Sequence, residues 1–224
     1  MLEVLKSTIL FVSALFPVVN PLGGSPIFLS LTREYSTFER TALARRIALD
    51  SFVLLTASFL VGTHVLAFFG ISIPVVQVGG GLIVMSTGWA MLTQKEEAGR
   101  GEAARHKAAQ GDIFKKAFYP LTMPLTVGPG SISIAITLGA NAPRHHGVNF
   151  LPMITALVGS LLIGLSIFLC YGLAERLARL LGATGMNVIL RLSAFLLVCI
   201  GVQILWNGVK ALLVSLPWRG GSVP

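Results

Sequence analysis

Residues 20–26 read N-P-L-G-G-S-P and follow an uncharged run at residues 7–19, S-T-I-L-F-V-S-A-L-F-P-V-V. As a helix this run reaches only about 20 Å at 1.5 Å per residue, which is short of the ~30 Å hydrocarbon core of a bilayer. Adding residues 27–32 gives a full span with the proline- and glycine-rich segment inside it. The sequence therefore predicts a break within a membrane-spanning helix. A proline kink in a continuous helix is the alternative, because membrane helices tolerate proline.

The composition is that of an integral membrane protein. Of 224 residues, 54% are hydrophobic and 12% are charged, with a mean hydropathy of +0.81, whereas soluble domains carry about 25% charged residues. The uncharged stretches predict six transmembrane helices, all of which we expect to be retained because no small-x-small cleavage site follows the first run. They lie at residues 7–32, 51–94 (two spans folded at 70–74), 117–143, 145–174 and 186–215.

The net charge of +8 is interpreted as a topology signal. Thirteen of the 17 basic residues lie between spans one and two, three and four, and five and six. The positive-inside rule then places the charged loop at residues 95–116 in the cytoplasm and both termini outside it. We expect a minor attraction to membrane lipid and no nucleic-acid partner. Cys170 and Cys199 lie in apolar spans and are interpreted as packing residues.

The proline-rich segment recurs in the second half of the chain. F-P-V-V-N-P-L-G-G-S-P at residues 16–26 aligns with Y-P-L-T-M-P-L-T-V-G-P at residues 119–129, and three prolines match at a separation of 103 positions. A weaker match, at a separation of 113 positions, pairs residues 80–88 with residues 193–201. These matches predict an internal repeat.

The repeat unit contains three spans, so the chain divides into residues 1–94, the cytoplasmic loop at 95–116, and residues 117–224. An odd number of spans makes the second copy enter the membrane from the opposite side. The predicted fold class is an all-α membrane protein with two inverted three-helix repeats, in which spans one and four are broken near the midplane. Many secondary transporters are built this way, with their sites where the interrupted helices meet.

The two breaks predict a binding site that needs no charged side chain. Proline suits the first turn of a helix, so Pro26 and Pro129 are expected to begin the second half-helices. Free backbone N–H groups and the positive dipole ends there favour a carboxylate. Unpaired carbonyl groups before Pro21 and Pro124 suit an ammonium group or a cation. The predicted ligand is a small zwitterion, with a proton or a sodium ion as candidates for coupling; we expect no cofactor, no metal and no catalytic residue.

Motifs along the whole chain resemble the MarC family of six-span membrane proteins, which overlaps the neutral amino acid transporter group. They are N-P-L-G-G-S-P at 20–26, F-G-I-S-I-P at 69–74, G-G-G-L-I-V at 79–84, P-L-T-M-P-L-T-V-G-P-G-S-I at 120–132 and G-V-Q-I-L-W-N-G at 201–208. The resemblance implies an inner-membrane protein that transports glycine, alanine, serine or threonine. It implies a substrate site lined by Asn20, Gly24, Ser25, Thr126, Gly128 and Ser131. The two predicted breaks add six further residues to this candidate substrate site: Pro21, Gly23, Pro26, Pro124, Pro129 and Gly130.

Three further polar residues are candidates for coupling or for the polar lining of the site. Asp50 is either a proton-coupling carboxylate or the partner of Arg46 in a helical i,i+4 ion pair. His64 either belongs to a proton relay or bonds to a neighbouring helix. Gln203 lies in mid-span and either contacts substrate or joins two helices.

The leading hypothesis is a secondary transporter that exports small neutral amino acids by alternating access, and not an enzyme. One alternative is a passive channel for small solutes. Another is an intramembrane serine protease that uses Ser25 and His64. The sequence leaves the oligomeric state open.

Overall fold

The computed structural model describes residues 2–93, 117–142 and 150–216, and every regular element in these segments is a helix. The elements are α1 (Leu2–Val19), α2 (Pro21–Leu31), α3 (Thr37–Phe68), α4 (Ile73–Thr93), η1 (Ala117–Thr126), α7 (Pro129–Ala140), α8 (Phe150–Gly172) and α9 (Ala174–Ser215). The predicted cytoplasmic loop at residues 95–116 lies outside the described residues.

Five helical segments are long and apolar enough to cross a bilayer. They are Leu2–Leu31 (α1 with α2), Thr37–Phe68, Ile73–Thr93, Phe150–Gly172 and Thr184–Ser215. The pair η1 and α7 passes the same test together and is bent by 69°, which gives six candidates if the pair is one span. The prediction of an all-α membrane protein is therefore confirmed, with five or six spans where six were expected.

Two helices extend well beyond the predicted spans. α3 begins at Thr37 because Ser36 and Glu39 form a capping box, in which the N–H of Ser36 donates to Oε2 of Glu39 at 2.8 Å and the N–H of Glu39 donates to Oγ of Ser36 at 3.3 Å. α9 begins at Ala174 and is interrupted at Gly182, where φ is +65°. Counting uncharged residues finds the apolar part of a helix but not its charged extension.

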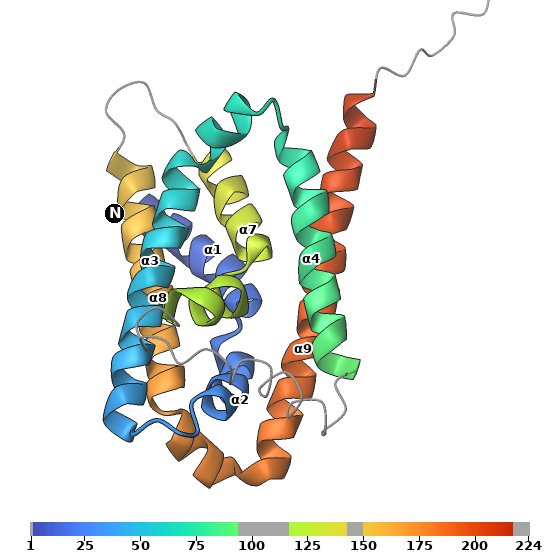
Figure 1. Ribbon diagram of the computed structural model, residues 1–224. Helices are drawn as coiled ribbons and strands as arrows, with labels where there is room; N and C mark the ends of the chain where they lie inside the picture. Colours follow the sequence, from blue (N-terminus) through green and yellow to red (C-terminus); the bar gives the residue numbers. More distant parts are fainter. Residues whose placement is uncertain (1, 94–116, 143–149, 217–224) are drawn as a thin grey trace, which may run out of the picture.

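The helices on either side of the two predicted breaks lie between two helix pairs (Figure 1). α3 packs against α8 on one side of the molecule, and α4 packs against α9 on the other. Helices α1 and α2 from the first half of the chain, and η1 and α7 from the second, occupy the space between these pairs. The one-residue interruption at Asn20 and the bend between η1 and α7 therefore both lie between the two helix pairs.

Glycines bring α4 and α9 into backbone contact. A Cβ on Gly81 would lie 2.7 Å from the carbonyl oxygen of Gly201, and a Cβ on Gly201 would lie 2.8 Å from the carbonyl oxygen of Gly81. About two helical turns away, a Cβ on Gly88 would lie 2.8 Å from the carbonyl oxygen of Ala194. Small residues allow membrane helices to approach this closely, so these glycines form a packing surface.

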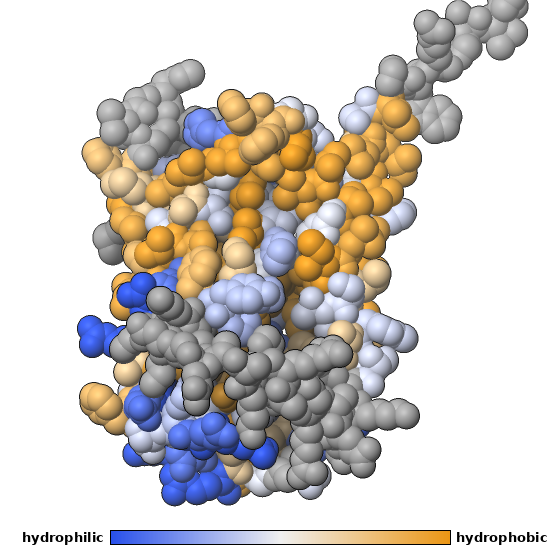
Figure 2. Space-filling model, in the orientation of Figure 1, coloured by the Kyte–Doolittle hydropathy of each residue, from blue (hydrophilic) through white to orange (hydrophobic). Residues whose placement is uncertain are grey.

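The surface divides into a broad apolar region and a charged end (Figure 2). Large apolar side chains such as Leu10, Leu161 and Leu196 are exposed on the outer faces of their helices, as expected where lipid replaces water. The basic residues that follow α2 and α8 lie at one end, because Arg40 of α3 pairs with Glu175 of α9 at 3.0 Å.

Candidate functional site

The first break is a single residue, Asn20, between α1 and α2. Its backbone is left-handed, with φ 48° and ψ 55°, a conformation that asparagine tolerates better than most residues. Its side-chain Oδ1 accepts a hydrogen bond from the N–H of Gly23 at 3.0 Å and so caps α2. α2 therefore begins at Pro21, and the prediction that Pro26 begins the half-helix is wrong, because Pro26 lies inside α2.

The second break separates η1 from α7. η1 has non-helical backbone angles at Tyr119 and Met123 and contains Pro124. Gly128 is the extended N-cap of α7, with φ −87° and ψ 177°, and Pro129 takes the first helical position, the place expected for it. The helix starts at Pro21 and Pro129 are thus 108 positions apart, not the 103 that the proline alignment predicts.

The two helix starts differ in their free backbone donors. In α2, the N–H of Gly23 donates to the side chain of Asn20, and the N–H of Gly24 donates to its carbonyl oxygen at 2.9 Å. In α7, Gly128 offers no side-chain cap, and the N–H of Ile132 donates to the Gly128 carbonyl at 3.2 Å. The preceding N–H groups, at positions 130 and 131, have no intrahelical acceptor. An anion is therefore favoured at the start of α7 rather than of α2.

Tyr171 of α8 connects the two breaks. Its hydroxyl oxygen lies 2.9 Å from Oγ1 of Thr126, at the end of η1. Because the Thr126 hydroxyl donates its proton to the carbonyl of Leu121 at 2.7 Å, Tyr171 is the donor of the bond that the two hydroxyls share. A Cβ on Gly24 of α2 would lie 2.6 Å from the same tyrosine oxygen. Gly24 and Thr126, predicted from separate halves of the chain, thus meet at one hydroxyl.

Sequence reasoning missed Tyr171. It lies near the end of an apolar span and belongs to none of the motifs. A weak indication was available, because a tyrosine hydroxyl inside an apolar helix generally needs a hydrogen-bond partner. The Tyr171 ring also stacks on Phe28 of α2, with ring centroids 4.6 Å apart and an angle of 12° between the planes. Both side chains are fully buried.

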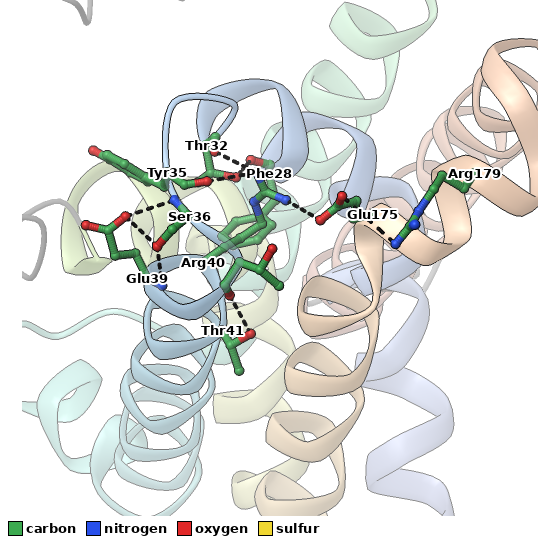
Figure 3. A network of polar contacts seen from close by, with 10 residues as sticks. Phe28, Thr32, Tyr35, Ser36, Glu39, Arg40, Thr41, Glu175 and Arg179 are labelled. Carbon is green, nitrogen blue, oxygen red and sulfur yellow. Dashed lines mark hydrogen bonds and ion pairs between the residues drawn. The ribbon is translucent and has the colours of Figure 1, made fainter.

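A polar network lies at the charged end of the molecule, next to this stack (Figure 3). Arg40, only 9% exposed, donates to the carboxylate of Glu175 at 3.0 Å and to the carbonyls of Thr32 and Tyr35, each at 3.1 Å. Thr32 in turn donates through Oγ1 to the carbonyl of Phe28 at 2.7 Å. The network joins the end of α2 to the start of α3 and the start of α9.

Gly23 and Gly130, also predicted from the breaks, pack against the outer helices. A Cβ on Gly23 would lie 2.8 Å from Cβ of Ser193 on α9, and a Cβ on Gly130 would meet the side chain of Val84 on α4. Ser25 is buried and donates to the carbonyl of Leu22 at 2.8 Å. Ser131, near the start of α7, is buried as well.

The three coupling candidates are not brought to the Tyr171 hydroxyl by any contact among the described residues. Asp50 forms an ion pair with Arg46 at 3.2 Å. His64 is exposed on α3. Gln203 is exposed on α9, where its Nε2 donates to Oδ1 of Asn207 at 3.0 Å. The structure therefore places all three at positions other than the meeting point of the breaks.

A separate groove of about 430 Å³ runs along α1. It is lined by Leu5, Thr8, Ile9, Val12, Ser13, Phe16 and Pro17 of α1 and by Leu162 of α8. None of the predicted substrate residues lines it, and a zwitterion would lose its hydration against these apolar walls. In the described segments, no group of three or more His, Cys, Asp or Glu residues is placed to hold a metal ion.

Apolar helices, a charged end and two interrupted helices at the centre define a multi-pass helical membrane protein. The model of the MarC family of integral membrane proteins matches residues 5–213. The chain is 33% identical over 218 residues to the UPF0056 inner membrane protein MarC of Salmonella paratyphi B, covering 95% of this chain and 98% of the relative. The proteins of that name from Citrobacter koseri and Escherichia coli O1:K1 are 32% identical over 219 residues, with the same coverage.

The chain therefore belongs to the MarC family of integral membrane proteins, as its motifs predict. The names of these relatives place them in the inner membrane. No solved structure matches the chain.

Proposed function

We propose that this protein is a secondary transporter that exports small neutral amino acids by alternating access between two inverted three-helix repeats. The observation that carries the proposal is the convergence of Gly24 and Thr126 on the hydroxyl of Tyr171. Sites of secondary transporters lie where interrupted helices of two repeats meet. Here the interrupted helices are α1 with α2 and η1 with α7.

The packing of α4 against α9 supports the inverted repeat. Gly88 of α4 faces the carbonyl of Ala194, while Gly201 of α9 faces the carbonyl of Gly81. Gly88 and Gly201 are 113 positions apart, and so are Gly81 and Ala194. One contact is thus the image of the other when the two helices are exchanged. Gly88 also faces the backbone nitrogen of Val198, and Gly201 faces that of Met85. Met85 and Val198 are again 113 positions apart.

The polarity around the breaks fits a zwitterion. The first N–H groups of α7, those of Gly130 and Ser131, have no acceptor within their own helix, which favours the carboxylate there. Because the Tyr171 hydroxyl donates its proton to Thr126, its oxygen can offer a ligand only a lone pair, which suits an ammonium group. The glycine at position 24 leaves little room beside this oxygen, which favours a small side chain on the substrate.

We propose that the described conformation is closed towards the charged end, which the positive-inside rule assigns to the cytoplasm. Tyr171 occupies the space next to Gly24, and the Phe28 ring and the Arg40–Glu175 pair lie beyond it. Entry of a cytoplasmic substrate then requires Tyr171 to move and Arg40 to release Glu175. Both chain termini lie on the other side of the membrane in this topology.

Uptake of radiolabelled alanine into liposomes that contain the purified protein tests the function. A proton gradient and a sodium gradient are imposed separately, with protein-free liposomes as the control. We expect accumulation above equilibrium with one of them, and competition by glycine, serine and threonine but not by alanine methyl ester. Uptake that stops at equilibrium under every gradient would instead identify a passive channel.

The protease alternative requires Ser25 to be activated. Ser25 donates its hydroxyl proton to Leu22 within its own helix, and His64 is exposed on α3. Labelling of the purified protein with a fluorophosphonate probe tests this alternative directly. We expect no difference in labelling between the wild type and Ser25→Ala.

A further inference from the structure

The outer face of α9 carries two amides in an apolar segment. Gln203 and Asn207 are both exposed, and Nε2 of Gln203 donates to Oδ1 of Asn207 at 3.0 Å. Both lie within Thr184–Ser215, which is apolar enough to cross a bilayer. Lipid tails offer no hydrogen-bond partner, so amides exposed to them are unfavourable unless another polar surface covers them.

These amides lie on the side of α9 that faces away from α4. α4 packs on the face of α9 that contains Gly201 and Leu205, because the backbones of both residues face Gly81. With 3.6 residues per turn, Gln203 lies about 200° around the helix from Gly201. It is therefore on the side of α9 opposite α4.

The same side of α9 has the spacing of a helix-packing seam. Six exposed residues follow one another at steps of four and three: Leu192, Leu196, Cys199, Gln203, Trp206 and Lys210. Two helices that pack with this spacing cross at about 20°, the usual geometry in membranes. A polar residue in the apolar part of such a seam fixes the register of the two helices, and Gln203 holds that position here. Lys210 lies close enough to the end of α9 for its long side chain to reach the headgroups.

We infer that this seam binds a second copy of the chain, so that two α9 helices pack in parallel in a dimer. Copies in one membrane share their orientation, and a two-fold axis along the membrane normal brings each residue of the seam to its own counterpart at the same depth. The inference does not depend on the proposed transport function.

The amides are complementary across such an axis. The hydrogen bond within each copy uses one N–H of Gln203 and the oxygen of Asn207. This leaves the Gln203 oxygen as an acceptor and the Asn207 NH₂ as a donor. Asn207 of one copy can therefore donate to Gln203 of the other, and the reverse, giving two equivalent bonds. Lipid on this face would satisfy neither group.

Cross-linking through Cys199, one turn before Gln203, tests the dimer. Protein with Cys170→Ser is reconstituted in liposomes, diluted with lipid over a hundredfold range, and treated with a short bis-maleimide. We expect a cross-linked dimer that disappears with Cys199→Ser. The matched control adds Leu161→Cys to the cysteine-free chain, because Leu161 is 60% exposed on α8 and not on the seam of α9. An equal yield from Leu161→Cys, or no dimer at any dilution, overturns the inference.

The role of the amides is tested separately by single-molecule counting of subunits in the same liposomes. Gln203→Leu and Asn207→Leu should each weaken dimerisation by about sevenfold to three-hundredfold, because each removes both symmetric hydrogen bonds and each bond between membrane helices contributes about threefold to twentyfold. As monomers, at high lipid dilution, both variants should unfold at the wild-type temperature, because leucine is favourable on a lipid-facing helix. Ser86→Leu is the control, since that exposed hydroxyl already donates to Ile83 within α4 at 2.9 Å. An unchanged dissociation constant in both amide variants overturns the proposed interface.

Discussion

Gly81 and Gly201 hold α4 and α9 together through their backbones: a Cβ on either would lie within 2.8 Å of the carbonyl oxygen of the other. Real Cβ atoms do not approach other atoms this closely, so neither position accepts a side chain without a shift of a whole helix. Because α4 comes from the first half of the chain and α9 from the second, this contact ties the two halves together.

Gly81→Ala should lower stability, and Gly79→Ala should not. The added methyl at Gly81 would lie 2.5 Å from the backbone nitrogen of Leu205, and overpacking of this kind costs about 1–3 kcal/mol. Gly79 is two residues away in α4 with nothing within 4 Å of its Cβ position, so alanine there should gain up to about 1 kcal/mol from helix propensity. Unfolding in detergent measures both. Equal stabilities of the two variants would contradict the backbone contact.

Arg40→Ala should destabilise the protein far more than Glu175→Gln. Arg40 is buried, and its loss removes two hydrogen bonds from a charged donor, to the carbonyls of Thr32 and Tyr35, at about 1.5–3 kcal/mol for each. The Glu175 side chain is 44% exposed, so solvent screening limits its contribution to about 1 kcal/mol or less. Chemical denaturation of the two variants gives the comparison. Equal losses would mean that the ion pair, not the capping of the carbonyls, is the main contribution of Arg40.

The same pair provides a test of the closed state. If Arg40 and Glu175 close the charged end, Glu175→Gln should raise the rate at which a membrane-impermeant thiol reagent labels a cysteine placed at Ser25 from that side. Ser25 is buried in the described conformation. The matched control is Asp50→Asn, which removes a carboxylate paired with Arg46 outside this network. An equal increase in both variants would rule out a specific closing role for Glu175.

Part of the fold and of the site could be predicted from the sequence because it follows from composition and local chemistry. Lack of charge identifies the apolar helices, and prolines with glycines mark the two interruptions. The start of α3 was also readable, since S-T-F-E at residues 36–39 is a capping-box pattern. The start of α2 was not, because proline is compatible with the first turn at both Pro21 and Pro26. The choice depends on Asn20, which adopts a left-handed turn and caps the helix.

The role of Tyr171 could not be derived from local sequence. Its partners Thr126 and Phe28 lie 45 and 143 positions away, and only the folded arrangement brings them together. A similar limit applies to Arg40, whose basic charge fits the topology pattern equally well whether it is exposed or buried.

The orientation in the membrane remains a prediction from the distribution of basic residues. A reporter that is active only outside the cytoplasm, fused after residue 215, should be active, because α9 starts at the charged end and runs to the opposite one. The same reporter inserted at Glu34, between α2 and α3, should be inactive. The reverse pattern would place the charged end outside and contradict the proposed topology.

The last prediction concerns Gly24 and the Tyr171 hydroxyl. Gly24→Ala would place a methyl group 2.6 Å from the hydroxyl oxygen but 3.4 Å from the ring carbons, so the conflict is with the oxygen alone. Tyr171→Phe removes this oxygen and keeps the stack on Phe28, losing one hydrogen bond to Thr126 at a cost of about 1 kcal/mol. Each single change should therefore lower stability, whereas the double variant should be more stable than the sum of the two losses implies.

A double-mutant cycle of unfolding free energies measures this coupling, which we expect to be about 1–2 kcal/mol, within the range for residues in contact. Gly128→Ala is the matched control from the other break. Its Cβ would lie 3.1 Å from the carbonyl of Pro124, so its effect should simply add to that of Tyr171→Phe. Additivity at Gly24 as well would show that the tyrosine hydroxyl does not fill the space beside this glycine. The proposed meeting point of the two breaks would then lose its central contact, since only Thr126 would still bind Tyr171.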